Sequence, residues 1–157
     1  MKEAKQVKIY TDGACTGNPG PGGYGTVLLY GDHRKELSGG YRLTTNNRME
    51  LMAAIVGLSA LKEKCHVLLY SDSKYVVDAM GQGWAVRWRT NGWKRNKKEK
   101  AVNPDLWEQL LTLCEKFHVE FRWVKGHSGD PENERCDQIA VAAAHQSNLP
   151  IDAGYIS

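Results

Sequence analysis

The sequence predicts an α/β fold in which a five-stranded mixed sheet is flanked by helices. Three strand patterns come first along the chain, and helix and strand patterns then alternate towards the C-terminus. This order is typical of a mixed sheet with helices on its faces. The chain has 157 residues, of which 41% are hydrophobic and 25% are charged. These values indicate one globular domain over residues 1–157 that is large enough to bury a core.

Short apolar runs bounded by turn residues predict the strands. The run that begins at Val7 closes at Asp12 and is followed by a turn-rich loop over residues 17–23. The next two strands flank a turn at Gly31 and Asp32, and we therefore expect them to form an antiparallel pair. The five predicted strands cover residues 7–12, 25–30, 35–41, 66–71 and 119–124.

Apolar positions at helical spacing predict the helices. Asn46 or Asn47 is expected to cap the first helix, and Asn103 with Pro104 is a cap and first-turn signature for the third. The tail, about residues 147–157, has a weak pattern and is expected to be loosely held. The predicted helices cover residues 46–61, 73–80, 104–117 and 131–146.

The most informative residues are four acids that this fold would deliver to one edge. Asp12 and Asp72 each close an apolar strand, and Glu50 and Asp137 each lie early in a helical pattern. Carboxylates gathered in one cleft repel one another, so at least one takes up a proton unless a cation compensates. Mg²⁺ favours carboxylate and phosphate oxygens. The pattern therefore points to a metal cluster of the kind that phosphodiester hydrolysis uses.

Each acid also has a simpler interpretation. Asp72 precedes a helix and could cap it, and Asp12 could form a turn. Glu50 resists such an explanation, because apolar residues surround it and a buried carboxylate is costly unless it is paired or metal-bound. Four independent coincidences would be needed to explain all four acids, so the joint metal-binding role is favoured. Asp137 shares its predicted helix with two other acids, Glu132 and Glu134.

Basic charge is concentrated in one segment, about residues 84–102, which we call the basic protrusion. The segment carries +6, so the rest of the chain carries −3 against a net charge of +3. Such an asymmetry indicates a polyanionic partner. Tryptophans alternate with the cations: Trp84 and Trp88 are expected to be partly exposed and to pack against sugars or bases, and Trp93 and Trp107 to lie in the core.

Nothing in the sequence indicates export or a membrane. No apolar run approaches the ~20 residues of a membrane span, and the first residues lack the apolar core of a signal peptide. The four cysteines show no metal-ligand spacing and are expected to be thiols in a reducing compartment. Cys15 is the thiol expected to face the acidic cleft. These observations predict a cytoplasmic protein with no membrane partner.

Five short motifs surround the acids in order along the chain: YTDGACTGNPG over residues 10–20, TNNRMEL over 45–51, SDS over 71–73, VKGHSG over 124–129 and NERCD over 133–137. Together they resemble the type-1 ribonuclease H family, specifically its short bacterial enzymes, from about Val7 to about Ala144. The resemblance implies a ribonuclease H-like fold. It also implies a monomeric endonuclease that hydrolyses the RNA strand of RNA–DNA hybrids and leaves 5′-phosphate and 3′-hydroxyl ends.

The resemblance also implies roles for individual residues. Asp12, Glu50, Asp72 and Asp137 are implied to be catalytic residues and the ligands of two Mg²⁺ ions, for which Mn²⁺ can substitute. His127 lies between glycine-containing turns after a strand, and an imidazole titrates near neutrality. The family resemblance implies that it assists catalysis by proton transfer or in product release. Its simpler interpretation is a loop histidine without a function.

A further set of residues is expected to contact nucleic acid. Asparagine amides both donate and accept hydrogen bonds, which suits 2′-hydroxyls and base edges in a wide minor groove. In the family, Trp88 matches a residue beside the DNA strand and Thr45 one near a DNA phosphate. The chain departs from some relatives at Val102, where they have lysine, and at Lys74, where glutamine is common. The expected contacts are Asn18, Thr45, Asn46, Asn47, Lys74, Trp84, Arg87, Trp88, Arg89, Lys97 and Lys98.

The sequence leaves two alternatives to a hybrid-cleaving endonuclease. A non-catalytic hybrid-binding module would explain the basic protrusion, but it gives no reason for a complete set of acids. Another nuclease on the same scaffold, such as a DNA junction resolvase or an integrase-like strand-transfer enzyme, would have different motifs and would commonly act as a multimer. A cleavage assay on hybrid, duplex RNA and duplex DNA separates these alternatives.

Overall fold

The computed structural model describes residues 5–126 and 128–155, and it confirms the five-stranded mixed sheet. In space the strands follow the order β3-β2-β1-β4-β5. The β1–β2 and β2–β3 pairs are antiparallel, whereas β4 runs parallel to both β1 and β5. The strands are β1 (Gln6–Cys15), β2 (Gly20–Tyr30), β3 (His33–Thr44), β4 (His66–Ser71) and β5 (His118–Trp123).

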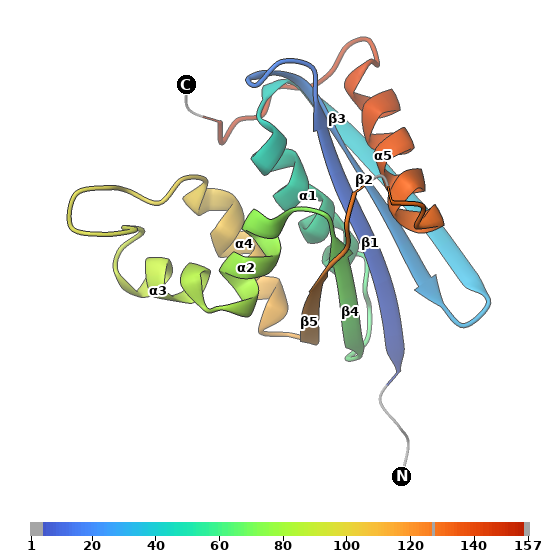
Figure 1. The fold of residues 1–157 in the computed structure, drawn as a ribbon, viewed down its shortest axis with the longest axis horizontal. Coiled ribbons are helices and arrows are strands. Elements are labelled where there is room, and N and C mark those ends of the chain that lie inside the picture. The colour runs from blue at the N-terminus through green and yellow to red at the C-terminus, as the bar shows by residue number, and fades with distance from the viewer. Residues whose placement is uncertain (1–4, 127, 156–157) are drawn as a thin grey trace.

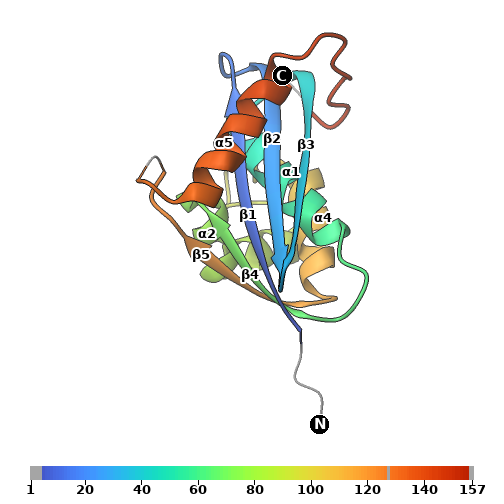
Figure 2. The same ribbon diagram turned by 90° about the vertical axis from the view of Figure 1, so that its right-hand side faces the viewer.

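Helices cover both faces of this sheet (Figure 1, Figure 2). On one face α5 packs across β1, β2 and β3, and on the other α1 packs on β1 and β2 with α4 beside it. No helix within the described residues combines the length and apolar character needed to cross a bilayer. The helices are α1 (Asn46–Ser59), α2 (Lys74–Gly81), α3 (Trp84–Thr90), α4 (Pro104–Cys114) and α5 (Pro131–Ala144).

The first two strands are longer than their apolar runs suggested. β1 continues to Cys15 and β2 begins at Gly20, so part of the loop expected over residues 17–23 is strand. Glycines in β2 let α5 lie directly on the sheet, because a Cβ at Gly23 or Gly25 would clash with the α5 backbone at Ala140 or Cys136. Residues that read as a turn in the sequence are therefore strand residues that make room for a helix.

The start of α1 differs from the prediction by one residue. Thr45, rather than Asn46 or Asn47, is the N-cap, and its Oγ1 accepts a hydrogen bond from Arg48 N at 3.2 Å. The backbone N–H of Asn46 instead donates to Asn18 Oδ1 at 3.0 Å. Three consecutive residues with N-capping side chains cannot be ranked from the local sequence. The loop that supplies Asn18 thus contacts the first residue of the helix.

The core lies between the sheet and the layer formed by α1 and α4. Trp107 is fully buried there, as predicted, and the rings of Tyr75 and Trp88 meet it edge-on at centroid distances of 5.4 and 5.7 Å. Trp84 and Trp88 are partly exposed, as predicted. The core position expected for Trp93 is confirmed only in part: the residue packs against the core cluster but is only partly buried, and it lies in a turn after α3 with a φ of 64°.

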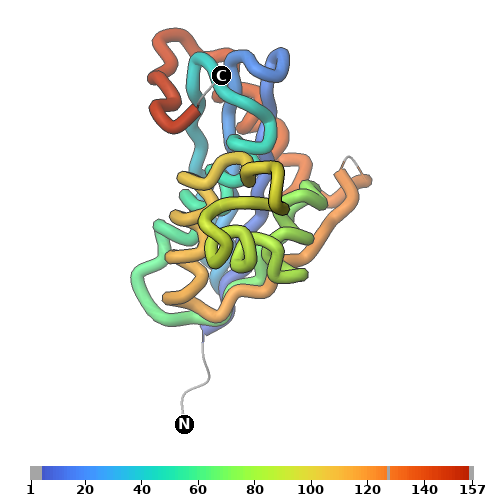
Figure 3. Tube along the Cα trace, turned by 90° about the vertical axis from the view of Figure 1, so that its left-hand side faces the viewer, coloured from blue at the N-terminus to red at the C-terminus, as the bar shows by residue number. Residues whose placement is uncertain are grey.

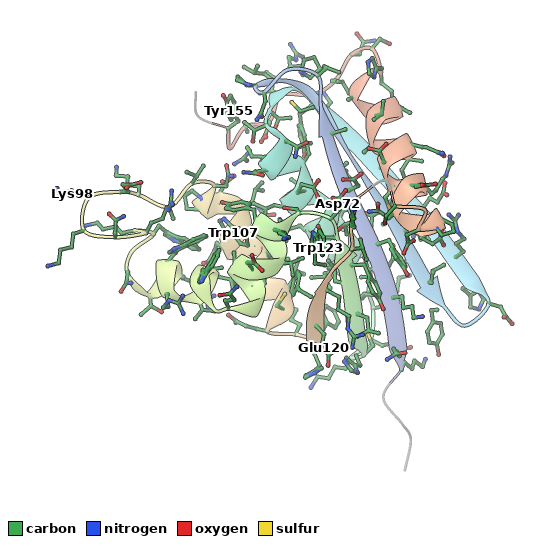
Figure 4. All side chains as sticks on the ribbon, viewed as in Figure 1. Asp72, Lys98, Trp107, Glu120, Trp123 and Tyr155 are labelled. Carbon is green, nitrogen blue, oxygen red and sulfur yellow. The ribbon has the colours of Figure 1, made fainter. Side chains whose placement is uncertain are left out.

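The basic protrusion projects from the body of the molecule beside α2 and α4 (Figure 1, Figure 3). It consists of α3 followed by a loop, which an isolated bridge between Lys94 and Lys100 closes into a hairpin-like turn. Lys98 lies near the tip of this loop (Figure 4). The cations of the protrusion are therefore held away from the core on a surface that a long polyanion can reach.

The described part of the C-terminal tail is anchored, in contrast to the loose tail expected from its weak local pattern. Asp152 is 8% exposed and accepts hydrogen bonds from Arg48 Nε at 2.7 Å and Thr44 Oγ1 at 2.8 Å. The carbonyl of Leu149 accepts a hydrogen bond from Arg42 Nε at 3.1 Å. The partner Arg48 lies 104 residues earlier in the chain, so no local pattern could reveal this contact.

Arg48 connects the tail to two helices. Its guanidinium also forms two hydrogen bonds with Asp105, at 2.9 and 2.7 Å, and one with Asn103 Oδ1 at 3.2 Å. Asn103 occupies the N-cap position of α4, as predicted, but its side chain makes no capping bond. Arg48, which is 1% exposed, thus holds the starts of α1 and α4 and the tail together.

Candidate active site

Two of the four predicted acids are neighbours because β1 and β4 are parallel. Thr11 and Ser71 are partners in register, so the next residues, Asp12 and Asp72, lie side by side where the two strands meet the same edge. Asp72 does not cap α2, since that role belongs to Ser73. Trp123, at the end of β5, donates from Nε1 to the Asp72 carbonyl at 3.1 Å (Figure 4). The carboxylates of Asp12 and Asp72 are therefore positioned by neighbouring strands of the sheet.

The third acid, Glu50, comes from the second turn of α1. This helix lies against the β1 backbone at Gly13, where a Cβ would be 2.6 Å from Glu50 N and 2.7 Å from the Met49 carbonyl carbon. Only glycine permits this approach. One carboxylate oxygen from each of Asp12, Glu50 and Asp72 lies within 4.8 Å of the others.

Asp137 lines the same cavity from α5. The cavity has a volume of about 460 Å³ and includes all four acids together with Asn46 and Cys15. Asp137 lies outside the tight group formed by the other three. Its acidic neighbour Glu132 is turned towards Arg34, with a 2.9 Å ion pair. The structure thus brings together the four acids that the sequence singled out.

Burial makes this cluster electrostatically costly without a cation. Asp12 and Glu50 are 4% and 3% exposed, and Glu50 Oε2 is buried without a hydrogen-bond partner among the described residues. Burial, with the nearby Asp72 charge, raises the pKa of Asp12 from its ordinary 3.8 to about 8. Burial and repulsion from Asp12 also raise the pKa of Glu50 well above its usual range. Within the part of the chain described, no lysine or arginine forms an ion pair with these acids.

The donor set fits a hard divalent cation. Every potential ligand is a carboxylate oxygen, the type that Mg²⁺ and Mn²⁺ prefer, and the unpartnered Glu50 Oε2 lacks any other compensation. A bound cation would reverse the repulsion that raises the pKa values of Asp12 and Glu50. The cluster therefore has the donor chemistry that a divalent-metal site requires.

This electrostatic conflict predicts a pH dependence for the metal-free protein. Between pH 4 and 8 the folded protein keeps a proton at Asp12 that the unfolded chain loses, so the free energy of unfolding should fall as pH rises through this window. Mg²⁺ binding requires loss of that proton, so the increase in Tm caused by Mg²⁺ should be larger at pH 8 than at pH 6. Melting curves with EDTA or Mg²⁺ test this. An equal increase at both pH values, or the same dependence in Asp12→Asn, would contradict it.

A second cavity adjoins the acidic one. It has a volume of about 670 Å³ and lies between the start of α1 and the basic protrusion. Asn46 lines the acidic cavity and the next residue, Asn47, lines this groove, so α1 begins at the junction of the two. The groove is also lined by Trp84, Arg87 and Trp88, together with Tyr75, Asn91, Arg95, Asn96 and Val102. We call this cavity the tryptophan groove.

The remaining residues expected to contact nucleic acid are dispersed. Lys74 Nζ lies over the Trp123 ring, 4.7 Å from its centroid, near the acidic cavity. Arg89 does not line the tryptophan groove; its Nη1 pairs with Glu115 at 2.9 Å. Lys97 and Lys98 lie in the exposed loop of the basic protrusion. The structure therefore brings Trp84, Arg87 and Trp88 together but separates Arg89 from them.

His127 lies outside the described residues. Its neighbour Gly126 is in contact with the acidic site, because a Cβ there would be 2.8 Å from Asp72 Oδ2. Sequence reasoning missed Gly126 and Trp123 as neighbours of the acids. Both follow from the parallel pairing of β4 and β5, in which Ser71 and Trp123 are partners. The exposure of Cys15 to the acidic cavity was predicted correctly.

Comparison with known proteins agrees with this geometry. The ribonuclease H family model matches residues 4–145. The ribonuclease H of Desulforamulus reducens is 71% identical over 148 residues, which cover 94% of this chain and 93% of that protein. The ribonuclease HI of Synechocystis sp. is 63% identical over 150 residues, covering 95% of this chain and 94% of that protein.

A solved structure shows the same architecture. The crystal structure of LC9-RNase H1, a type 1 RNase H with the type 2 active-site motif, superposes with a TM-score of 0.80 at 32% identity. The match covers 92% of this chain and 74% of that one. With a family model spanning most of its length, close relatives of that name and a mixed sheet that gathers four acids, the chain belongs to the type-1 ribonuclease H family of metal-dependent endoribonucleases.

Proposed function

We propose that this ribonuclease H hydrolyses the RNA strand of RNA–DNA hybrids at the acidic cavity, with Asp12, Glu50, Asp72 and Asp137 as catalytic residues and ligands of two Mg²⁺ ions. The observation that carries the proposal is the buried group of carboxylates without a compensating cation among the described residues. Metal ions at such a site supply an activated water and stabilise the charge on the leaving oxygen. Products with 5′-phosphate and 3′-hydroxyl ends are part of the proposal.

The chain's own residues divide into those that hold charge and those that orient the substrate. The four carboxylates would hold the cations, and the bound cations would offset the negative charge that otherwise repels a phosphate. Asn46 and Asn47 present amide groups between the acidic cavity and the tryptophan groove, where a minor groove with 2′-hydroxyls can be read. His127 is proposed to hold or move a proton during hydrolysis.

The tryptophan groove is proposed to hold the DNA strand. Trp84 and Trp88 offer ring surfaces to sugars and bases, and Arg87 offers a cation to a phosphate. Asn18 and Thr45 accept hydrogen bonds from the first residues of α1 and are proposed to contact the nucleic acid there. The proposed contact set is completed by four cations: Lys74, Arg89, Lys97 and Lys98. Arg89 would first have to leave its ion pair with Glu115.

One assay tests the proposed function. Labelled RNA–DNA hybrid, duplex RNA and duplex DNA are each incubated with the protein in Mg²⁺, in Mn²⁺ or in EDTA. Cleavage of the RNA strand of the hybrid alone, with either metal and not in EDTA, is the expected result, with 5′-phosphate on the products. Binding of the hybrid without cleavage would indicate a non-catalytic module. Cleavage or joining of duplex DNA would indicate a resolvase or integrase-like activity.

The basic protrusion should control affinity rather than turnover. Neutralising Arg87, Arg89, Lys97 and Lys98 to glutamine removes four cations of the proposed contact set. The log–log dependence of hybrid affinity on salt should then flatten by up to about 0.9 per lost contact, and KM should rise while kcat changes much less. Binding measured across salt concentrations checks this.

A matched control separates local contacts from net charge. The quadruple variant of Lys35, Lys62, Lys64 and Lys116 to glutamine removes the same charge from residues that line neither the acidic cavity nor the tryptophan groove. It should leave the salt dependence of affinity close to that of the parent. If both variants flatten the salt dependence of hybrid affinity equally, the effect is due to net charge alone. The basic protrusion would then not be the surface that binds the substrate.

We also propose one ribonuclease H domain over residues 1–157, acting as a cytoplasmic monomer. All four cysteines are free, which suits a reducing compartment. A single chain carries the whole set of four acids, so a second copy is not required to complete the site. Sedimentation of the protein with and without hybrid tests the oligomeric state.

A further inference from the structure

A second group of metal-ligating side chains lies at the opposite end of the parallel strands from the acidic cavity. His66 begins β4, and His118 and Glu120 lie at the start of β5. From His66 to Asp72 the chain is extended over six residue steps, which span about 20 Å. Glu120 and Asp72 accordingly lie at opposite ends of these strands in Figure 4. The group is therefore separate from the site proposed for catalysis.

Sheet geometry brings these three side chains together. His66 and His118 are direct partners in the parallel register of β4 and β5, and their rings meet edge-on with centroids 4.6 Å apart. Glu120 is two residues after His118, so the two side chains project from the same face of the strand. One ligand atom from each of the three residues lies within 4.8 Å of the others.

The distances match those of a tetrahedral metal centre. Metal–ligand bonds of about 2.0–2.1 Å place the ligand atoms of tetrahedral Zn²⁺ roughly 3.3–3.4 Å apart. Glu120 Oε1 lies 3.3 Å from His66 Nε2 and 3.8 Å from His118 Nε2. Small side-chain adjustments would complete the geometry, since the side chains of His118 and Glu120 are 73% and 41% exposed.

The buried nitrogen of His66 also indicates room for a ligand. The Nε2 atom of His66 is buried, although the side chain as a whole is 32% exposed, and the nearest acceptor is Glu120 Oε1 at 3.3 Å, with which it makes no well-aligned hydrogen bond. A buried nitrogen that lacks a partner is costly, and a metal ion would satisfy it. Arg122 donates to the other oxygen of Glu120 at 3.1 Å, which leaves Oε1 directed to the histidines. The arginine fixes the carboxylate but also lowers the affinity for a cation.

We propose that His66, His118 and Glu120 form a second metal site that binds a transition-metal ion, Zn²⁺ in particular, with water in the fourth position. Two imidazoles and one carboxylate are a zinc ligand set, whereas Mg²⁺ prefers oxygen ligands alone. The two sites thus differ in chemistry and would take different metals. Because β5 is the edge strand and, among the residues described, pairs only with β4, the ion would link this edge to the rest of the sheet.

Calorimetric titration with Zn²⁺ tests the proposal. Excess Mg²⁺ is present throughout to occupy the acidic cavity, and the parent is compared with His118→Gln and Glu120→Gln. Both substituted side chains are substantially exposed, so these variants should fold. The matched control is His33→Gln, which removes an exposed histidine at the far edge of the sheet, on β3. All four proteins are titrated under the same reducing conditions.

The parent and the His33→Gln control should each bind one Zn²⁺ ion at this site with the same Kd. Either ligand substitution should raise that Kd by at least roughly tenfold. Saturating Zn²⁺ should also raise the Tm of the parent and of the control more than that of either ligand variant. Superimposable titrations of the parent and the ligand variants would overturn the proposal. An equal loss in the His33→Gln control would overturn it too, since binding would then follow the number of surface histidines.

Discussion

Asp12→Asn should reduce Mg²⁺-dependent cleavage of the RNA strand by about three orders of magnitude or more while making the metal-free protein more stable. Asparagine keeps the shape of the side chain but lacks the charge that binds a hard cation, so the activity loss reflects a lost metal ligand. The gain in stability follows from electrostatics. Burial and then repulsion from Asp12 raise the pKa of Glu50, and Asp12 is itself only 4% exposed, so an ionised Asp12 opposes folding when no metal is bound.

Two measurements check this result together. Initial rates on an RNA–DNA hybrid give the activity, and melting in EDTA at pH 8 gives the stability. Asp32→Asn, the same chemical change at an exposed turn residue, serves as the control and should alter neither. Cleavage at the parental rate by folded Asp12→Asn would remove Asp12 from the catalytic site. A large loss of metal-free stability would contradict the proposed repulsion among the acids.

Arg48→Met should lower the free energy of unfolding by about 3–5 kcal/mol, the cost of leaving a buried charge without its partner. Asp152 would lose both hydrogen bonds from the guanidinium, at 2.7 and 3.0 Å, and keep only the one from Thr44. For a protein of this size, such a change corresponds to a decrease in Tm of about 10 °C. Chemical denaturation and calorimetry at neutral pH measure the effect.

A second substitution identifies the cause of the instability. In the Arg48→Met background, Asp152→Asn removes the unpaired charge and should recover part of the lost stability. If the double variant is no more stable than Arg48→Met, lost packing rather than the charge of Asp152 is responsible. Arg122→Met, at an exposed arginine that pairs with Glu120 on the surface, should change stability by no more than about 0.5 kcal/mol.

Contacts between neighbouring segments explain why the sheet and the acids could be predicted. The strand over residues 66–71 is a continuous apolar run and has the predicted bounds, because a strand buried on both faces has a strong local signal. Two acids that close parallel strands must meet at one edge, so Asp12 and Asp72 followed from the strand pattern. Glu50 followed from its apolar neighbours, which required a compensating partner for its charge.

Features that depend on distant partners were not predictable in the same way. Thr45 rather than Asn46 caps α1 because Asn18, from another loop, takes the Asn46 N–H. The tail has no pattern of its own, and only the fold brings Asp152 to Arg48. Trp93 is a large aromatic residue of the kind that cores contain, but it lies in a turn with a positive φ. An aromatic side chain gives no sign of such a turn in the sequence.

A substitution at Gly25 would affect both the packing of this enzyme and the position of its acidic residues. Gly25 is the cross-strand partner of Asp12, and its missing side chain leaves the space that the Cys136 carbonyl occupies, one residue before Asp137. Even a single added methyl group would have to push α5 outward and carry Asp137 away from the other three acids. A substitution of Gly25 would therefore change the spacing of the carboxylates, although the residue itself is structural. Stability and metal affinity could not be optimised separately at this position.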